Sequence, residues 1–306
     1  MNWFAALAFF VAAAASADAR IEQARREGEV VWYTAMNLPD AEALKKPFLA
    51  RYPFLALSVL RAPGEKVRTR ILTEARGQRY AWDVVSFNLL DIDALDREGL
   101  LAPHSSAAIY VRQYVIGYNT RQVKPEQAPR SWEDLLAAHW TGKLAIDESD
   151  VEWYAAMLDY WGRDKGLGYM RALARQQPQQ RRGHQLLTRL LVAGDFPLAL
   201  VHASEIDQER QDGAPVDWVR TLDPVITSPS HVAIAAKAPH PAAARLFVDF
   251  LLSEEGQRAI ASRGRVPART DLAGAAPLKV HYVSAHLAAD FNRYEREFRD
   301  IFGRAP

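Results

Sequence analysis

Short apolar runs alternate with amphipathic segments in the first third of the chain. The apolar runs are rich in β-branched and aromatic residues, which is typical of buried strands, and they occupy residues 29–35, 56–62 and 82–87. The segments around them have helical spacing, at residues 20–27, 40–51 and 65–77. Strands that alternate with helices indicate βαβ units and a mostly parallel sheet. The pattern therefore predicts an α/β lobe.

A second series of elements follows a β-prone stretch at residues 110–120 and a Pro-bearing loop that leads to a helix N-cap at Ser131. We expect the chain to cross into a second lobe there. That lobe is predicted to hold strands and helices at residues 143–147, 149–161, 164–176, 184–193 and 196–201. The segment QQRRGH, residues 179–184, is expected to be a solvated loop.

The last third returns the chain to the first lobe. Two β-prone runs lie within residues 216–237, and one helix is predicted over 241–262, with Pro241 in its first turn. This order predicts an α/β fold of two lobes with a ligand cleft between them. Lobe 2 is expected to span residues 115–225, and lobe 1 to be discontinuous, with residues 20–114 and 226–306.

The first residues have the pattern of an export signal. The run from Trp3 to Ala17 is apolar and uncharged, and it is shorter than the roughly 20 residues that a membrane helix needs. Small residues of the A-x-A type follow, as at a signal-peptidase site. We therefore expect residues 1–19 to be a signal peptide and the protein to be periplasmic; a buried N-terminal helix is the alternative.

Composition excludes several classes of protein. Of the 306 residues, 49% are hydrophobic and 25% charged, which is typical of a globular protein and excludes a disordered or collagen-like chain. The formal net charge of +1 and the lack of a basic stripe with interleaved aromatic residues argue against nucleic-acid binding. The sequence contains no cysteine, so a cysteine nucleophile, a Cys-based metal site and a lipid-anchoring cysteine are excluded.

Candidate ligand-binding residues follow the predicted strands. In open parallel α/β sheets, ligands bind beyond the carboxyl ends of strands, near helix N-termini. The candidates are Thr34, Met36, Asn37, Arg61, Ser86 and Asn88 in the first lobe, and Asp147, Glu148, Trp153, His202, Ser204 and Glu205 in the second.

These candidates have different expected roles. The Ser, Thr and Asn side chains would exchange hydrogen bonds with a ligand, although residues of these types after a strand also fit helix caps. Asp147 and Glu205 would meet a positive ligand group, whereas Arg61 would meet an acidic one. Trp153 would offer a stacking face, or would belong to a core-facing stripe with Met157.

Signatures of catalysis and of resident metal are missing from the sequence. It has no G-x-S-x-G elbow, no P-loop and no G-x-G-x-x-G fingerprint, so we expect no catalytic residue and no cofactor. Its histidines include no H-E-x-x-H motif. Asp91 and Asp93 are interpreted as acids at the start of a helix rather than as metal ligands.

Five motifs, in order, carry a family resemblance. They are GEVVWYTA, VIGYNTRQVKPEQAPRSWEDLLAAHWTGKLAID, GHQLLTRLLVAGDFPLALVHA, GAPVDWVRTLDP and HPAAARLFVDFLLSEEGQRAIASRGRVPAR. Together they resemble the bacterial extracellular solute-binding proteins of family 1, and most closely the ferric-iron type of periplasmic binding protein that serves ABC importers. The resemblance implies a type II periplasmic-binding fold that closes on its ligand, and extends from about Gly28 to Arg269.

The expected iron ligands are replaced in this sequence. Iron-binding members hold ferric ion with two adjacent tyrosines just after the strand that here is FPLALV, whereas this chain has Ser204 and Glu205 there and no Tyr-Tyr pair. The ligand is thus left open between iron, an iron chelate, a small organic ion and a small oxyanion, as is the participation of a metal.

The resemblance and the signal peptide together imply a monomeric receptor that delivers its ligand to an ABC permease. The alternatives are a periplasmic sensor that docks on a signalling receptor, and an exported enzyme on the same fold.

Overall fold

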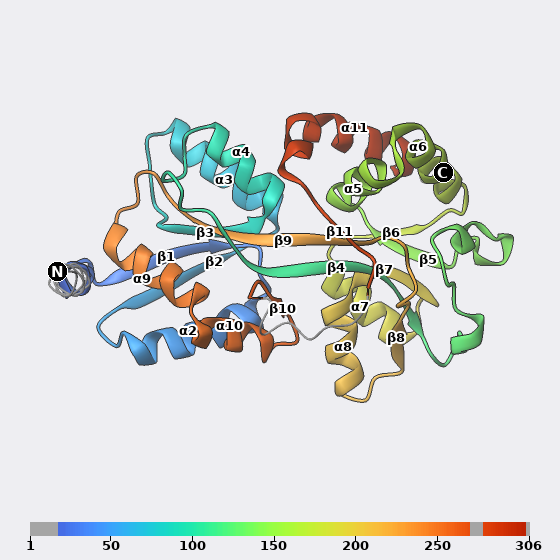
Figure 1. Cartoon of the computed structure of the whole chain (residues 1–306), viewed down its shortest axis with the longest axis horizontal. Helices are drawn as coiled ribbons and strands as arrows, with labels where there is room; N and C mark the ends of the chain where they lie inside the picture. Colours follow the sequence, from blue (N-terminus) through green and yellow to red (C-terminus); the bar gives the residue numbers. More distant parts are fainter. Residues whose placement is uncertain (1–17, 270–277, 304–306) are drawn as a thin grey trace, which may run out of the picture. The chain divides into compact units, whose positions relative to one another are not determined.

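The computed structural model describes residues 18–269 and 278–303, and the chain divides into two compact units (Figure 1). Unit 1 contains the described residues up to Ile109 together with Ser230–Arg263, and unit 2 contains Tyr110–Pro229 and the described residues from Gly264 onward. Apart from its last two residues, the predicted signal peptide lies outside the described residues. A helix runs from residue 18 to 27, and none of the described helices is long and apolar enough to cross a membrane.

Unit 1 is built on a sheet in which β1 pairs in parallel with both β2 and β3. The last part of β9 pairs with β3 in the antiparallel direction. The strands are β1 (Glu29–Thr34), β2 (Ala56–Arg61), β3 (Val84–Asn88) and β9 (Val225–Ile234). The predicted βαβ order of the first third of the chain is therefore confirmed.

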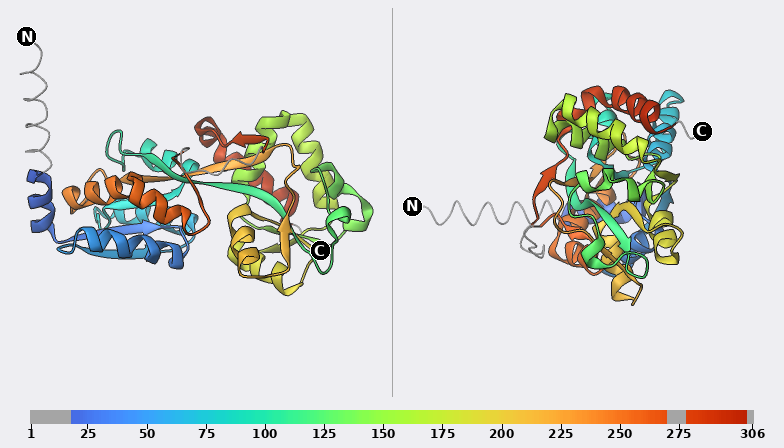
Figure 2. Two further views of the ribbon diagram at one scale, coloured as in Figure 1. Left: turned by 60° about the horizontal axis from the view of Figure 1, so that its bottom comes forward. Right: turned by 90° about the vertical axis from the view of Figure 1, so that its right-hand side faces the viewer.

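Helices cover both faces of the unit 1 sheet (Figures 1 and 2). On one face, α3 (Gly64–Arg76) packs against α4 (Leu89–Arg97). The other group consists of α2 (Leu38–Arg51), α9 (Pro241–Leu252) and α10 (Glu254–Ala261). Burial of large aromatic rings joins this second group to the sheet, since the ring of Phe247 lies 5.1 Å from Trp32 and 4.9 Å from Phe48.

The single helix predicted over residues 241–262 is two helices. Ser253 has extended backbone angles, with ψ 163°, and its hydroxyl accepts a hydrogen bond from the backbone N–H of Gly256 at 3.2 Å. The serine thus caps α10 and breaks the run. A Cβ at Gly256 would collide with the backbone carbonyl of Phe250, so the turn between the two helices requires glycine there.

The strands of unit 2 pair in both the parallel and the antiparallel direction. Strand β5 pairs in parallel with β6 and β7, and β4 runs antiparallel to β7, β8 and β10, while β11 pairs with β9. These strands are β4 (Ala107–Asn119), β5 (Leu144–Asp147), β6 (Gln179–Arg181), β7 (Leu198–His202), β8 (Val216–Trp218), β10 (Val266–Pro267) and β11 (Val280–Tyr282). Strand β6 lies in the segment that the sequence predicted to be a loop, and that prediction was wrong.

Two groups of helices lie on opposite faces of the unit 2 sheet (Figure 1). The first contains α5 (Val151–Trp161), α6 (Arg163–Arg175) and α11 (Phe291–Phe302), and the second contains α7 (His184–Ala193) and α8 (Ala203–Gln211). Short 3₁₀ helices complete the unit: η1 (Pro125–Gln127), η2 (Glu133–Leu136), η3 (Ala138–Trp140) and η4 (Ala285–Asp290).

The C-terminal segment belongs to unit 2, whereas the sequence assigned all of residues 226–306 to lobe 1. Helix α11 packs on α5, where the ring of Phe298 meets Tyr154 at 5.8 Å. Burial of its aromatic stripe requires a partner helix, and the sequence pattern of α11 did not identify that partner. Strands β4 and β9 pass from one unit to the other, and the divisions fall at 109/110 and 229/230 rather than at the predicted 114/115 and 225/226.

Candidate functional site

The carboxyl ends of three parallel strands in unit 2 meet the N-termini of the helices that follow them. Asp147 ends β5, and its carboxylate accepts hydrogen bonds from the backbone N–H of Gly183, at 2.6 Å, and from the N–H and hydroxyl of Ser149, at 2.9 and 2.6 Å. Asp150 in turn accepts from the N–H of Asp147 at 3.1 Å. These bonds join the turn before α5 to the turn before α7, and so place Asp150 beside the first residue of α7.

His184, that first residue, is partly buried and forms an ion pair with the buried Asp150. Its Nε2 lies 2.9 Å from Oδ1 of Asp150. Burial by itself lowers the pKa of His184, but the charge of Asp150, its hydrogen bond, and the charges of Asp147 and Glu205 outweigh burial and raise this pKa to about 9. The imidazole is therefore a cation at neutral pH.

His202, which ends β7, has the opposite electrostatic environment. Its ring centroid lies 4.0 Å from that of His184, and its Nδ1 lies 3.6 Å from Oε1 of Glu205. Burial and the charge of His184 lower the pKa of His202 to about 3, despite the nearby carboxylate. His202 is therefore neutral.

Glu205 stays ionised in this setting. Burial raises its pKa, but the hydrogen bond and charge of the His202 ring and the charges of His184 and Arg265 lower the pKa to about 2. Its second oxygen accepts from the hydroxyl of Thr188 at 3.1 Å. Since the Nδ1 of neutral His202 faces this carboxylate, we place the ring proton on Nδ1, which leaves Nε2 as an acceptor.

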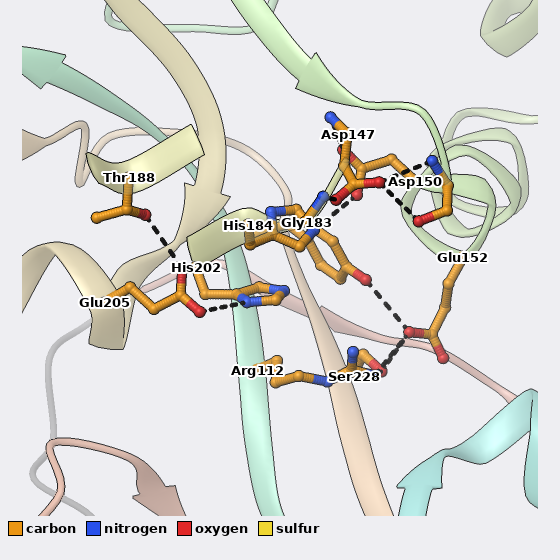
Figure 3. A network of polar contacts seen from close by, with 12 residues as sticks. Arg112, Asp147, Asp150, Glu152, Gly183, His184, Thr188, His202, Glu205 and Ser228 are labelled. Carbon is orange, nitrogen blue, oxygen red and sulfur yellow. Dashed lines mark hydrogen bonds and ion pairs between the residues drawn. The ribbon is translucent and has the colours of Figure 1, made fainter. Parts of the chain in front are cut away.

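Glu152, in the first turn of α5, is the second buried carboxylate centre. Its Oε2 accepts from Arg112 Nη2 at 2.9 Å, from the Ser228 hydroxyl at 2.6 Å and from the Tyr114 hydroxyl at 3.3 Å. Burial raises the pKa of Tyr114 well above its ordinary value, so that its hydroxyl remains a donor. The Tyr114 ring also contacts the rings of His184 and His202, with centroid distances of 5.7 and 5.0 Å, and so joins the two groups. We call these residues the unit 2 network: Arg112, Tyr114, Asp147, Asp150, Glu152, His184, Thr188, His202, Glu205 and Ser228. Figure 3 labels all of them except Tyr114.

Among the buried polar atoms of the unit 2 network, Nδ1 of His184, Nε2 of His202 and Oε1 of Glu152 have no hydrogen-bond partner within the described part of the chain. We call such an atom open. Each open atom lowers the stability of the fold by about 1–3 kcal/mol, so native proteins rarely leave a buried polar atom without a partner. Their concentration at the carboxyl ends of parallel strands points to a binding site. Across residues 18–269 and 278–303, no set of three or more His, Asp or Glu side chains is arranged to hold a metal ion.

The structure brings together some of the second-lobe candidates. Asp147, His202 and Glu205 belong to the unit 2 network, and Ser204 lies between the last two in the first turn of α8. Glu148 is exposed and pairs with Arg182. The remaining candidate, Trp153, lies elsewhere.

Trp153 is fully buried. Its ring lies 5.6 Å from that of Trp132, and Met157 and Leu158 on the same helix are buried with it. Of the two predicted roles, Trp153 therefore has the second, as part of a core-facing stripe, and neither face of its ring is left exposed for a ligand.

In unit 1, Thr34 and Ser86 use their hydroxyls within the protein. Ser86 Oγ accepts from Trp32 Nε1 at 2.9 Å and lies 2.8 Å from Thr34 Oγ1, which accepts from the backbone N–H of Met36 at 3.0 Å. All of these side chains are buried. They hold the end of β1 against the end of β3. Arg61 is exposed and reaches the Met36 carbonyl at 3.4 Å.

Asn37 and Asn88 are helix caps. The Asn37 side chain accepts from the N–H of Asp40 at 2.9 Å at the start of α2, and Asn88 accepts from the N–H of Asp91 at 2.8 Å at the start of α4. Asp91 also meets Arg68 at 2.8 Å, which agrees with its interpretation as an acid in the first turn of a helix.

We expect Asn88→Ala to lower the free energy of unfolding by about 1 kcal/mol, because it removes an N-cap. Urea denaturation would measure the change, with Asn88→Asp as the matched control because aspartate is also a good cap. An undiminished stability in Asn88→Ala would contradict the capping role.

Sequence reasoning did not select several members of the unit 2 network. Glu152 and Asp150 follow a predicted strand closely enough to have been included, and His184 is the first residue of a predicted helix. Arg112 and Ser228 lie within strands and carry no local signal, since only the pairing of distant segments brings them to Glu152.

Residues 30–266 match the model of the bacterial extracellular solute-binding proteins. The chain belongs to this family, whose members are binding proteins rather than enzymes, and the predicted resemblance is confirmed. A protein from Haemophilus influenzae with no characterised function is 24% identical over 162 residues, which cover 50% of this chain. The match spans 47% of that relative, about half its length.

Solved structures show the same fold. Iron-bound HitA from Pseudomonas aeruginosa superimposes with a TM-score of 0.78 at 19% identity, covering 89% of this chain and 99% of HitA. The periplasmic binding protein AfuA from Actinobacillus pleuropneumoniae, with fructose-6-phosphate bound, has a TM-score of 0.80 at 22% identity, covering 91% and 99%. A ferric binding protein from Campylobacter jejuni has a TM-score of 0.76 at 15% identity, covering 89% and 99%. The predicted periplasmic-binding fold is confirmed.

Proposed function

We propose that this protein is a periplasmic receptor that captures one small solute and delivers it to the permease of an ABC importer. Family membership supports the receptor class. The observation that carries the proposal is the set of open, buried polar atoms on His184, His202 and Glu152, at the strand ends where α/β proteins bind ligands.

The proposed contacts in unit 2 extend from these three side chains to Glu205 and Ser204. The strand-end candidates of unit 1 remain predicted ligand contacts, of which Thr34, Met36 and Ser86 are buried and Asn37, Arg61 and Asn88 are more accessible. Neighbours with this fold are described with iron or with fructose-6-phosphate, so ligand class varies on a shared architecture.

A thermal-shift screen tests the receptor function. The purified protein is unfolded and refolded to remove any retained solute, and is then heated with ferric citrate, inorganic phosphate, fructose 6-phosphate, choline, arginine or spermidine. A compound at 100 times its Kd should stabilise the fold by about 2.7 kcal/mol and raise the midpoint by several degrees.

The matched pair of variants for this screen is His202→Gln and His139→Gln. His202 lies in the unit 2 network, whereas His139 is exposed. We expect the first variant to reduce the ligand-induced shift and the second to keep it. If no compound raises the midpoint of the wild-type protein, the receptor proposal loses its support.

A further inference from the structure

Carboxylate side chains of the protein itself lie at the helix N-termini of unit 2. A helix N-terminus attracts negative charge, and an oxyanion ligand would ordinarily bind there. Here the Asp147 carboxylate accepts from Gly183 just before α7, while Glu152 and Glu205 lie in the first turns of α5 and α8. An oxyanion entering the unit 2 network would therefore meet carboxylates at each of these helix starts.

The charges of this region also favour a cation. The region contains four carboxylates, on Asp147, Asp150, Glu152 and Glu205. It contains three cations, on His184, Arg112 and Arg265, and the charge of Arg265 lowers the pKa of Glu205. Neutral His202 adds no charge. Among these side chains, negative charge exceeds positive charge by one, and a ligand with a positive charge would balance it.

Two of the three open atoms call for hydrogen-bond donors on that ligand, whereas the third, Nδ1 of protonated His184, is itself a donor and calls for an acceptor on the ligand. Oε1 of Glu152 is an acceptor on a carboxylate whose other oxygen is already used by Arg112, and Nε2 of His202 is an acceptor because Nδ1 faces Glu205. Both side chains are more than nine-tenths buried, with exposed fractions of 5% for Glu152 and 7% for His202. A charge-assisted hydrogen bond from a ligand N–H would satisfy each of them.

We propose that the unit 2 network binds an organic cation that carries several N–H donors, of the ammonium or guanidinium class. Glu152 and His202 accept hydrogen bonds from it, and Glu205 holds the His202 ring in the accepting tautomer. The inference rests on the proposed receptor function and names the chemistry of its ligand. Its ligand is of a different chemical class from ferric ion, and within the described residues no group of three or more His, Asp or Glu side chains is placed to hold a metal ion.

A competition experiment tests this assignment. The refolded protein is equilibrated with an equimolar mixture of spermidine, arginine, choline, fructose 6-phosphate, inorganic phosphate and ferric citrate, and native mass spectrometry identifies the retained compound. We expect spermidine or arginine to be retained. Choline is the chemical control, since it is a cation without an N–H donor.

Two variants locate the site. Glu152→Gln keeps the size of the side chain but removes its charge, and should weaken retention of the amine by about 10-fold or more, as expected for a hydrogen bond to a charged group. Glu148→Gln, on an exposed side chain just before α5, should retain the amine like the wild type. Thermal melts of both variants at equal protein concentration report whether each is folded.

Each outcome has a defined meaning. Retention of an N–H cation that Glu152→Gln loses supports the proposal. Retention of a phosphate compound, ferric citrate or choline instead overturns the ligand assignment and leaves the receptor function standing, whereas retention of nothing contradicts both.

Discussion

Replacing Glu152 by alanine is expected to lower the free energy of unfolding by about 3 kcal/mol, the effect of breaking a buried ion pair. The carboxylate accepts hydrogen bonds from Arg112, Ser228 and Tyr114, and its side chain is 5% exposed. Alanine would leave these donors facing a cavity in the interior of unit 2. Urea denaturation at neutral pH measures the change.

Glu148→Ala is the matched control for this prediction. Glu148 also pairs with an arginine, Arg182, but the two side chains are 36% and 64% exposed. An exposed ion pair contributes about 0–1 kcal/mol, so the control should unfold almost as the wild type does. Equal losses in the two variants would show that Glu152 has no special role in holding unit 2 together.

The second large effect is expected in the dependence of stability on pH. The pKa of His184 is raised in the folded state to about 9, from an ordinary value of 6.5. The contribution of His184 to the free energy of unfolding is therefore fully present below pH 6.5. It is lost as pH rises through 9, which lowers the free energy of unfolding by roughly 3 kcal/mol. The free energy of unfolding should accordingly fall between pH 6.5 and 9.

His202 should produce the opposite slope on the acid side. Its folded pKa of about 3 lies below the ordinary 6.5, so its contribution is present above pH 6.5 and is lost as pH falls toward 3. Glu205, whose pKa is lowered from 4.5 to about 2, adds to this loss below pH 4.5. Stability should therefore be greatest near pH 6.5.

Denaturation curves collected from pH 4 to 9.5 test this profile. His184→Gln should flatten the alkaline slope, because glutamine does not titrate, whereas His139→Gln at an exposed position should leave the slope unchanged. A wild-type stability that stays constant between pH 6.5 and 9 would show that the Asp150–His184 ion pair does not hold the proton as we infer.

Local patterns were sufficient for much of the fold. The apolar runs at residues 29–35 and 56–62 became β1 and β2 to within one residue, because a buried strand needs only its own β-branched and aromatic side chains to be recognised. The predicted helix at residues 184–193 is α7. By contrast, β6 is only three residues long and polar, and it is a strand because it pairs with β5.

The candidate site divided in a similar way. Placement after a strand was enough to select Asp147, His202 and Glu205, which the structure brings into one network. The same rule also selected Asn37 and Asn88, which the structure uses as helix caps, because short polar side chains after a strand serve both purposes.

The sequence by itself determined the α/β class, the order of most elements and the family, because these depend on periodicity and on motifs that are local in the chain. Only the tertiary structure decided which polar atoms are open. Glu152 meets Arg112 and Ser228 across separations of 40 and 76 residues, and His184 approaches His202 from another strand end. The charge on each of these groups depends on burial and on neighbours that are remote in sequence, and so it is a property of the folded chain.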